Sequence, residues 1–239
     1  MIHYCRSVSL FVVLLITFFL VVNVKADKNN KFELNISRYT GMSGAYLSGG
    51  LNEFDKGNMG GARQLFDAAI KADKELWPAY FMRAQVWMQA RKYELALQDI
   101  NAAARIEPHF TRTFIVRAEI YEALGRCADG LADLNQVIKI HSTPQSVAFA
   151  LERRAALHIN CRNTPIYDPK KALEDATKAS NMDGLAIYLD TLALAYAVNG
   201  DFDSAIRYEK KAIDSGRLDA DELKSVQRRL AQFERRQKL

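Results

Sequence analysis

The chain has 239 residues, of which 49% are hydrophobic and 26% are charged, and its formal net charge is +5. This length suits one domain with an appendage, and this composition excludes a disordered or fibrous chain. The net charge is too small to indicate binding to nucleic acid, which requires a strongly basic face.

An apolar segment near the N-terminus, Ser7–Val24, carries no charge, follows Arg6 and ends in Val24-Lys25-Ala26. A basic start, an apolar stretch and small residues before the cleavage position are typical of a secretory signal peptide. We therefore expect a signal peptide over residues 1–26 and an exported protein, periplasmic or secreted. An uncleaved anchor that leaves the rest of the chain outside the cytoplasm is the alternative, because the segment is just long enough to span a bilayer. The polar residues 27–42 are expected to form a linker.

Small residues recur at a fixed period along the rest of the chain. One series is Gly50, Ala84, Ala118, Ala155 and Ala193, and a second is Ala62, Ala96, Gly130, Ala172 and Ala205. The first three members of each series are 34 residues apart, a period typical of stacked helical hairpins. Large residues precede the first series by four positions, which places an apolar stripe on the first helix of each hairpin, and the small residues let the second helix approach closely. The pattern predicts an all-α fold in which helix pairs stack and share one core.

The second of these hairpins has the most regular sequence. It carries Tyr80, Ala84, Trp87, Tyr93, Ala96, Ala103 and Pro108. On these residues the chain resembles the tetratricopeptide repeat family. The resemblance implies a right-handed superhelical solenoid of about five repeats. The implied bounds are 43–76, 77–110, 111–144, 148–185 and 186–217.

The fourth repeat is expected to contain an enlarged turn, because two prolines and several polar residues lie between Asn160 and Pro169. The last two repeats resemble those of bacterial, often exported, tetratricopeptide proteins. Residues 218–239 are predicted to form a basic capping helix, whose polar outer side solvates the end of the stack. A basic helix of this kind is also able to contact a membrane surface or an acidic partner, which is the alternative interpretation.

No catalytic motif, phosphate-binding loop or metal-ligand spacing occurs in the sequence. His158 occupies the aromatic position of a first helix, where a packed side chain is expected rather than a catalytic one. The sequence therefore predicts no enzyme, no cofactor and no metal.

The resemblance implies that the first helices of the repeats line a concave face that binds a protein or peptide partner. The residues carried over are Leu47, Leu51, Phe81, Gln85, Met88, Gln89, Arg112, Ile115, Glu119, Glu122, Phe149, Glu152 and Arg153. The N-terminal end of this face is apolar, which suits an amphipathic helix or an extended segment. The linker filling the groove is the alternative. A second function remains open: a structural assembly factor or subunit of a cell-envelope complex without a discrete peptide site.

Two cysteines, Cys127 and Cys161, lie in corresponding turns of adjacent repeats. An exported chain meets an oxidising compartment, where such a pair can form a disulfide. Stacked turns lie on the same edge of the solenoid, although the phase of the two helices allows the side chains to diverge. Two unpaired, buried cysteines are therefore the alternative.

Overall fold

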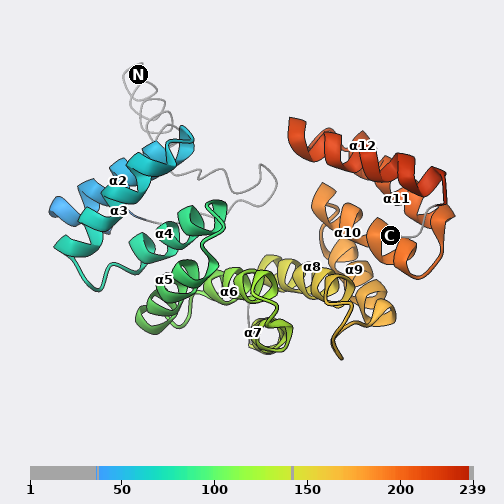
Figure 1. Cartoon of the computed structure of the whole chain (residues 1–239), viewed down its shortest axis with the longest axis horizontal. Helices are drawn as coiled ribbons and strands as arrows, with labels where there is room; N and C mark the ends of the chain where they lie inside the picture. Colours follow the sequence, from blue (N-terminus) through green and yellow to red (C-terminus); the bar gives the residue numbers. More distant parts are fainter. Residues whose placement is uncertain (1–35, 37, 141–142, 237–239) are drawn as a thin grey trace, which may run out of the picture. The chain divides into compact units, whose positions relative to one another are not determined.

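The computed structural model describes Ile36 and residues 38–140 and 143–236 (Figure 1). The expected signal peptide and most of the expected linker lie outside these residues. Within the described part all regular secondary structure is α-helical. None of the described helices is long and apolar enough to cross a membrane. The chain divides into two compact units, Met1–Ile106 and Glu107–Leu239, and each is described by itself.

The first unit contains two antiparallel helix pairs. They are α2 (Gly41–Asp55) with α3 (Met59–Ala72), and α4 (Trp77–Gln89) with α5 (Tyr93–Ile106). Helix α3 also packs on α4, so the two pairs stack.

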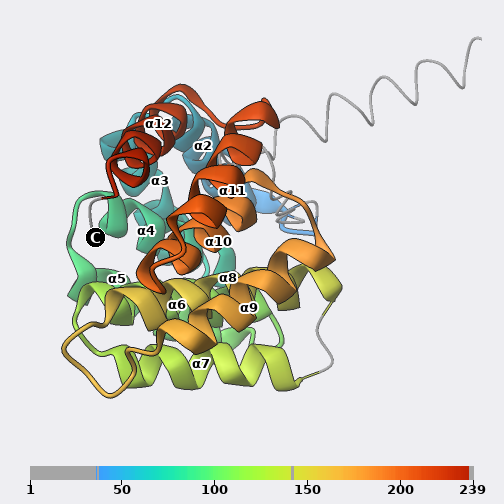
Figure 2. The same ribbon diagram turned by 90° about the vertical axis from the view of Figure 1, so that its right-hand side faces the viewer.

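The second unit contains three helix pairs and a final helix. The pairs are α6 (Thr111–Ala123) with α7 (Cys127–Lys139), α8 (Pro144–Asn160) with α9 (Pro169–Met182), and α10 (Ala186–Val198) with α11 (Phe202–Asp214). The final helix is α12 (Ala220–Glu234), which packs on α11. In Figure 2, α10 lies beside α9 and α11 lies beside α12. The all-α architecture of stacked helix pairs predicted from the period is confirmed.

Three-residue turns join the two helices of most pairs, and each needs one residue in the left-handed region. Glycine fills this position at Gly57, Gly125 and Gly200, with φ between 72° and 87°. Arg91 takes it in the second pair, with φ of 55°. Glycine adopts this region without steric cost, which explains why it recurs at the end of the first helix.

The small residues of both series lie where helices cross, and every member is buried. A Cβ atom added to Gly50 would lie 2.5 Å from the ring of Phe66, and one added to Gly130 would lie 3.0 Å from Leu157. The helices therefore approach closely because these positions carry little or no side chain.

The fourth pair differs from the sequence expectation at its start. Helix α8 begins at Pro144 rather than at residue 148, because the Thr143 side chain accepts a hydrogen bond from the Ser146 amide and proline is favourable in a first turn. The turn that follows α8 spans residues 161–168 and is longer than the others. The buried ring of His158 holds this turn, since its Nδ1 lies 2.6 Å from the Ile166 carbonyl oxygen.

Helix α12 begins with a capping box. The Asp219 side chain accepts a hydrogen bond from the Glu222 amide, and the Glu222 side chain accepts one from the Asp219 amide. Its buried side chains are Val226 and Phe233. Lys224 of α12 lies 3.6 Å from Asp221, and Arg236, just after the helix, lies 3.5 Å from Asp203.

Candidate partner-binding surface

The apolar end of the predicted partner-binding face is buried. Leu47, Leu51 and Phe81 each expose 1% or less of their surface, and Phe81 lies edge-on to Trp77 with ring centroids 6.4 Å apart. The expected open apolar groove is therefore wrong at this end. The sequence identified the helix face on which these residues lie, but it carries no signal for whether that face is covered.

Three further residues of the predicted face are buried in the second unit. Ile115 and Phe149 belong to the apolar cluster around α8, and Glu152 is 1% exposed. The residues that remain at least partly exposed are Gln85, Met88, Gln89, Arg112, Glu119, Glu122 and Arg153. The accessible part of the predicted face is therefore mainly polar and charged.

A charged cluster joins α6, α8 and α10 on this face of the second unit. Arg153 pairs with Glu152 at 2.6 Å and with Glu119 at 3.5 Å. The other oxygen of Glu152 accepts a hydrogen bond from Thr191 at 2.7 Å. The Arg112 guanidinium lies 3.9 Å from the centroid of the Phe149 ring, which is close enough for a cation–π contact.

The partly buried setting of this cluster shifts its pKa values. Burial raises the pKa of the Glu119 carboxyl, although Arg153 and Arg112 oppose the shift. Burial also disfavours the charge on Arg153, but Glu152 and Glu119 outweigh it and raise the pKa of the guanidinium. Arg153 therefore stays charged and holds two carboxylates from different helices.

The structure contains a second charged cluster, which was not predicted from the sequence. Arg229 of α12 pairs with Glu209 of α11 at 3.1 Å and contacts Asp190 of α10. Glu209 is fully buried, and its Oε2 atom has no hydrogen-bond partner among the described residues. Burial and the neighbouring Asp190 raise the pKa of Glu209 to about 9, which favours the protonated form of this carboxyl.

Arginine–aspartate pairs recur between the two helices of successive hairpins. Arg83 pairs with Asp99, Arg117 with Asp133, and Arg154 with Asp175, each through two hydrogen bonds of 2.6–2.8 Å. Each arginine directly precedes a member of the first small-residue series, and each aspartate follows a member of the second series by three positions. This spacing was visible in the sequence and could have predicted the pairs.

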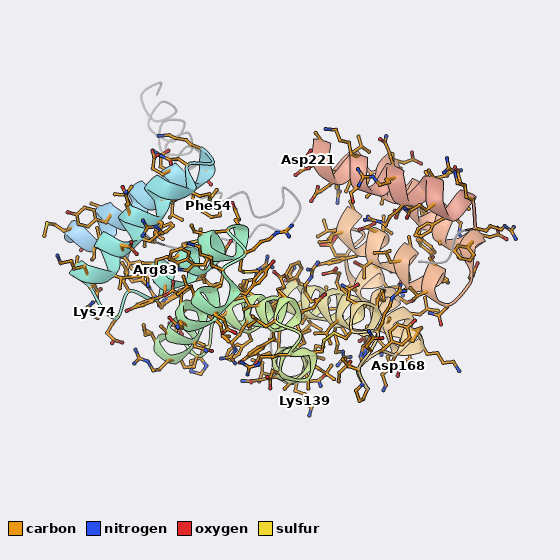
Figure 3. All side chains as sticks on the ribbon, in the orientation of Figure 1. Phe54, Lys74, Arg83, Lys139, Asp168 and Asp221 are labelled. Carbon is orange, nitrogen blue, oxygen red and sulfur yellow. A yellow bond between two sulfur atoms is a disulfide. The ribbon has the colours of Figure 1, made fainter. Side chains whose placement is uncertain are left out.

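Two of these arginines also reach the second helix of the preceding hairpin. Arg83, labelled in Figure 3, bonds Asp67 of α3 at 2.6 Å as well as Asp99 of α5. Arg154 bonds Asn135 of α7 at 2.6 Å as well as Asp175 of α9. A planar guanidinium can bond two acceptors at once, so each arginine ties neighbouring repeats together.

Cys127 and Cys161 form a disulfide, with Cα atoms 6.4 Å apart. Cys127 is the first residue of α7, and Cys161 is the residue that caps the C-terminus of α8. The bridge therefore connects the third hairpin to the fourth beside the enlarged turn. Both cysteines are buried in the cluster that also contains Leu157.

In the described part of the chain, no group of three or more His, Cys, Asp or Glu side chains is arranged to hold a metal ion. The buried charged groups instead pair with one another between helices. This arrangement presents partly exposed polar side chains on helices that ion pairs hold together.

Comparison with known proteins agrees with this architecture. Residues 47–109 match the family model described as "Tetratricopeptide repeat". This region of the chain therefore carries tetratricopeptide repeats. Members of this family are in general interaction modules, and the same helix-pair arrangement extends beyond the matched residues.

Individual relatives are distant. The rat protein "DnaJ homolog subfamily C member 3" is 29% identical over 83 residues, which is 35% of this chain and 16% of that protein. The chain thus spans a small part of this relative. A thermophilic TPR protein in Thermus thermophilus has a TM-score of 0.65 at 18% identity and covers 80% of this chain and 98% of its own. YrrB, described as a TPR protein with an unusual peptide-binding site, has a TM-score of 0.50 at 18% identity over 71% of this chain and 84% of its own.

Proposed function

We propose that this protein is a non-catalytic scaffold that binds a peptide segment or a partner protein on the face formed by the first helices of its repeats. The observation that carries the proposal is the braced array of helix pairs, in which Arg83 and Arg154 fix the spacing of neighbouring repeats. Within each unit, stacked pairs hold the half-exposed polar residues of the first helices in place before a partner arrives, which lowers the entropy cost of binding. YrrB, a repeat protein of the same fold, has a peptide-binding site.

The accessible chemistry favours a polar partner surface over an apolar helix. Met88 and Gln89 on α4, and Glu122 and Arg153 on the second unit, remain accessible, whereas the large apolar side chains of the face are buried. We expect contacts through hydrogen bonds and charge pairs, with Met88 as an adaptable apolar contact.

We also propose that the protein acts outside the cytoplasm. The apolar segment Ser7–Val24 and the residues Val24-Lys25-Ala26 support this, since they have the pattern of a signal peptide. The Cys127–Cys161 disulfide gives independent support, because disulfides persist in oxidising compartments and are rare in the cytosol.

Capture of partners from the native compartment tests the scaffold proposal. The variant Met88→Glu/Gln89→Arg/Glu122→Lys changes only accessible residues of the face, and Gln227→Arg on the outer side of α12 is the matched control. We expect the triple variant to lose a specific partner that the control retains. A large assembly that co-purifies equally with both variants would instead favour a structural subunit of a cell-envelope complex.

A further inference from the structure

The step from α9 to α11 lacks an arginine of the kind that links second helices at two other steps of the stack. Arg83 links α3 to α5, and Arg154 links α7 to α9. The corresponding position of α10, directly before Ala193, is Leu192, whose side chain is buried among small apolar residues. Among the described residues no hydrogen bond or salt bridge joins α9 to α11.

A trough of about 580 Å³ opens beside α9, and its shape is open to solvent rather than enclosed. Its lining consists of Lys170, Leu173, Glu174, Thr177 and Lys178 from α9 and Asn199 from the turn after α10. Asn199 is fixed in place, because its amide donates to the carbonyl oxygens of Pro169 and Ala195 at 2.7 and 2.8 Å. The end of the trough is thus preformed.

Leu173 of the lining shares an apolar cluster with two aromatic side chains. Leu173, Tyr196 and Tyr208 are partly buried and pack against the same apolar cluster. The two tyrosine rings stack with centroids 5.4 Å apart and planes within 7°. Stacked, partly exposed tyrosines next to a leucine offer a rigid contact area of the kind that is common at protein interfaces.

The rim of the trough carries two cations and one acid, and two further cations lie on α11. Lys170 and Lys178 are exposed on α9, and Arg207 and Lys211 lie 5.3 and 5.0 Å from the centroid of the Tyr208 ring on α11. Glu174 is the acidic residue of the lining. Asp168 and Asp201 lie at the starts of α9 and α11, where their carboxylates accept the Lys171 and Ser204 amides.

We propose that this trough binds an amphipathic segment of a partner protein, with apolar side chains on Leu173 and the tyrosine stack and acidic side chains facing Lys170 and Lys178 at the rim. Charge complementarity selects the acidic partner, because a basic segment would face these two lysines. The surface lies on the second helices of the repeats, whereas the function proposed above uses the first helices. Each proposal can therefore fail without the other.

Fluorescence anisotropy with two synthetic probes tests this inference on the purified, disulfide-bonded chain. One labelled peptide of 14 residues carries leucine at positions 3, 6, 10 and 13 and glutamate elsewhere, and its counterpart carries lysine in place of every glutamate. We expect the glutamate peptide to bind, with an affinity that falls as salt rises, and the lysine peptide not to bind.

Two variants locate the binding. The rim variant, Lys170→Glu/Lys178→Glu, reverses the charge of the two rim lysines. The control, Lys139→Glu/Lys224→Glu, makes the same charge change on exposed residues elsewhere in the second unit. We expect the rim variant to bind the glutamate peptide about tenfold or more weakly than the wild type does. The control variant should change this affinity by less than about twofold. Leu173→Ser should weaken binding with both rim lysines intact, and circular dichroism melting checks that each variant is folded.

Several results would overturn the inference. They are the absence of binding up to millimolar protein, equal binding of the two peptides, and an equal effect of the rim and control variants. In a further contrary outcome, the glutamate peptide keeps its affinity for the rim variant and loses it for the Met88→Glu/Gln89→Arg/Glu122→Lys variant. That result would place the peptide on the first helices, which contradicts this inference and supports the proposed function.

Discussion

Asp175 of α9 accepts two hydrogen bonds from Arg154 of α8, at 2.7 and 2.8 Å. The aspartate side chain is only 4% exposed, so its carboxylate depends on the arginine for the bonds that water would otherwise supply. The same relationship holds between Arg83 and Asp99 and between Arg117 and Asp133. It identifies an energetic contribution that apolar periodicity does not reveal.

Asp175→Ala should lower the free energy of unfolding by about 2–3 kcal/mol, because it removes the carboxylate that balances the partly buried charge of Arg154 and leaves only the neutral Asn135. Urea denaturation followed by circular dichroism measures the change. Asp221→Ala is the control, since it removes an exposed pair with Lys224 at 3.6 Å and should change stability by less than about 0.5 kcal/mol. Equal effects of the two changes would show that Arg154 contributes no more than a surface pair.

Gly50→Ala should destabilise the protein by about 1–3 kcal/mol through overpacking, because the new methyl group would lie 2.5 Å from the Phe66 ring. Thermal melting or urea denaturation checks this. Gly60→Ala is the matched helical control: the nearest atom lies 3.8 Å away, and alanine favours the helix, so a neutral or stabilising effect is expected. If Phe66→Leu does not restore part of the loss in Gly50→Ala, the ring is not the cause.

Replacing both Cys127 and Cys161 by alanine should lower stability by roughly 3–4 kcal/mol, the value that the chain-entropy model gives for a loop of this length. The two cysteines are 34 residues apart. A reductant should lower the melting temperature of the wild-type protein and leave the double variant unchanged. Mass spectrometry of the unreduced, denatured protein after alkylation gives a direct check, and two alkylated thiols would contradict the bridge.

The pKa of Glu209, raised to about 9, predicts a pH dependence of stability. The unfolded carboxyl has a pKa near 4.3, so between these values the folded state holds a proton that the unfolded state releases. This group therefore makes the protein less stable as pH rises, by at most about 1.4 kcal/mol per pH unit, until the folded carboxyl ionises.

Glu209→Gln keeps a neutral side chain beside Asp190 and Arg229 and removes the titration. Urea midpoints measured from pH 5 to pH 8 should decrease more steeply for the wild type than for this variant, and the variant should be the more stable at pH 8. Parallel pH profiles for the two proteins would show that Glu209 is ionised in the folded state.

Export should remove residues 1–26. Val24-Lys25-Ala26 has small residues at the positions that signal peptidases require, so amino-terminal sequencing of the protein from its native compartment should begin at Asp27. A protein that begins at Met1 and stays with the membrane fraction would show that this segment is an uncleaved anchor.

The sequence by itself determined the repeat. Gly50, Ala84 and Ala118 recur at 34 residues, and because a helix crossing tolerates only small side chains, their spacing fixes where paired helices meet. Turn glycines such as Gly57 and Gly125, with positive φ, then fix where first helices end. These signals are local and periodic, so they predicted the helix pairs, the enlarged turn near Cys161 and the final helix.

Only the tertiary structure decided which side chains of the predicted binding face are accessible. Leu47 and Phe81 lie on the expected helix face but are buried, because exposure depends on everything packed against that face and not on helical phase. The pairing of Cys127 with Cys161 likewise depends on how adjacent hairpins stack. Glu209 and Arg229 meet for the same reason: they are 20 residues apart on different helices, and only the docking of α12 brings a buried acid and its guanidinium together.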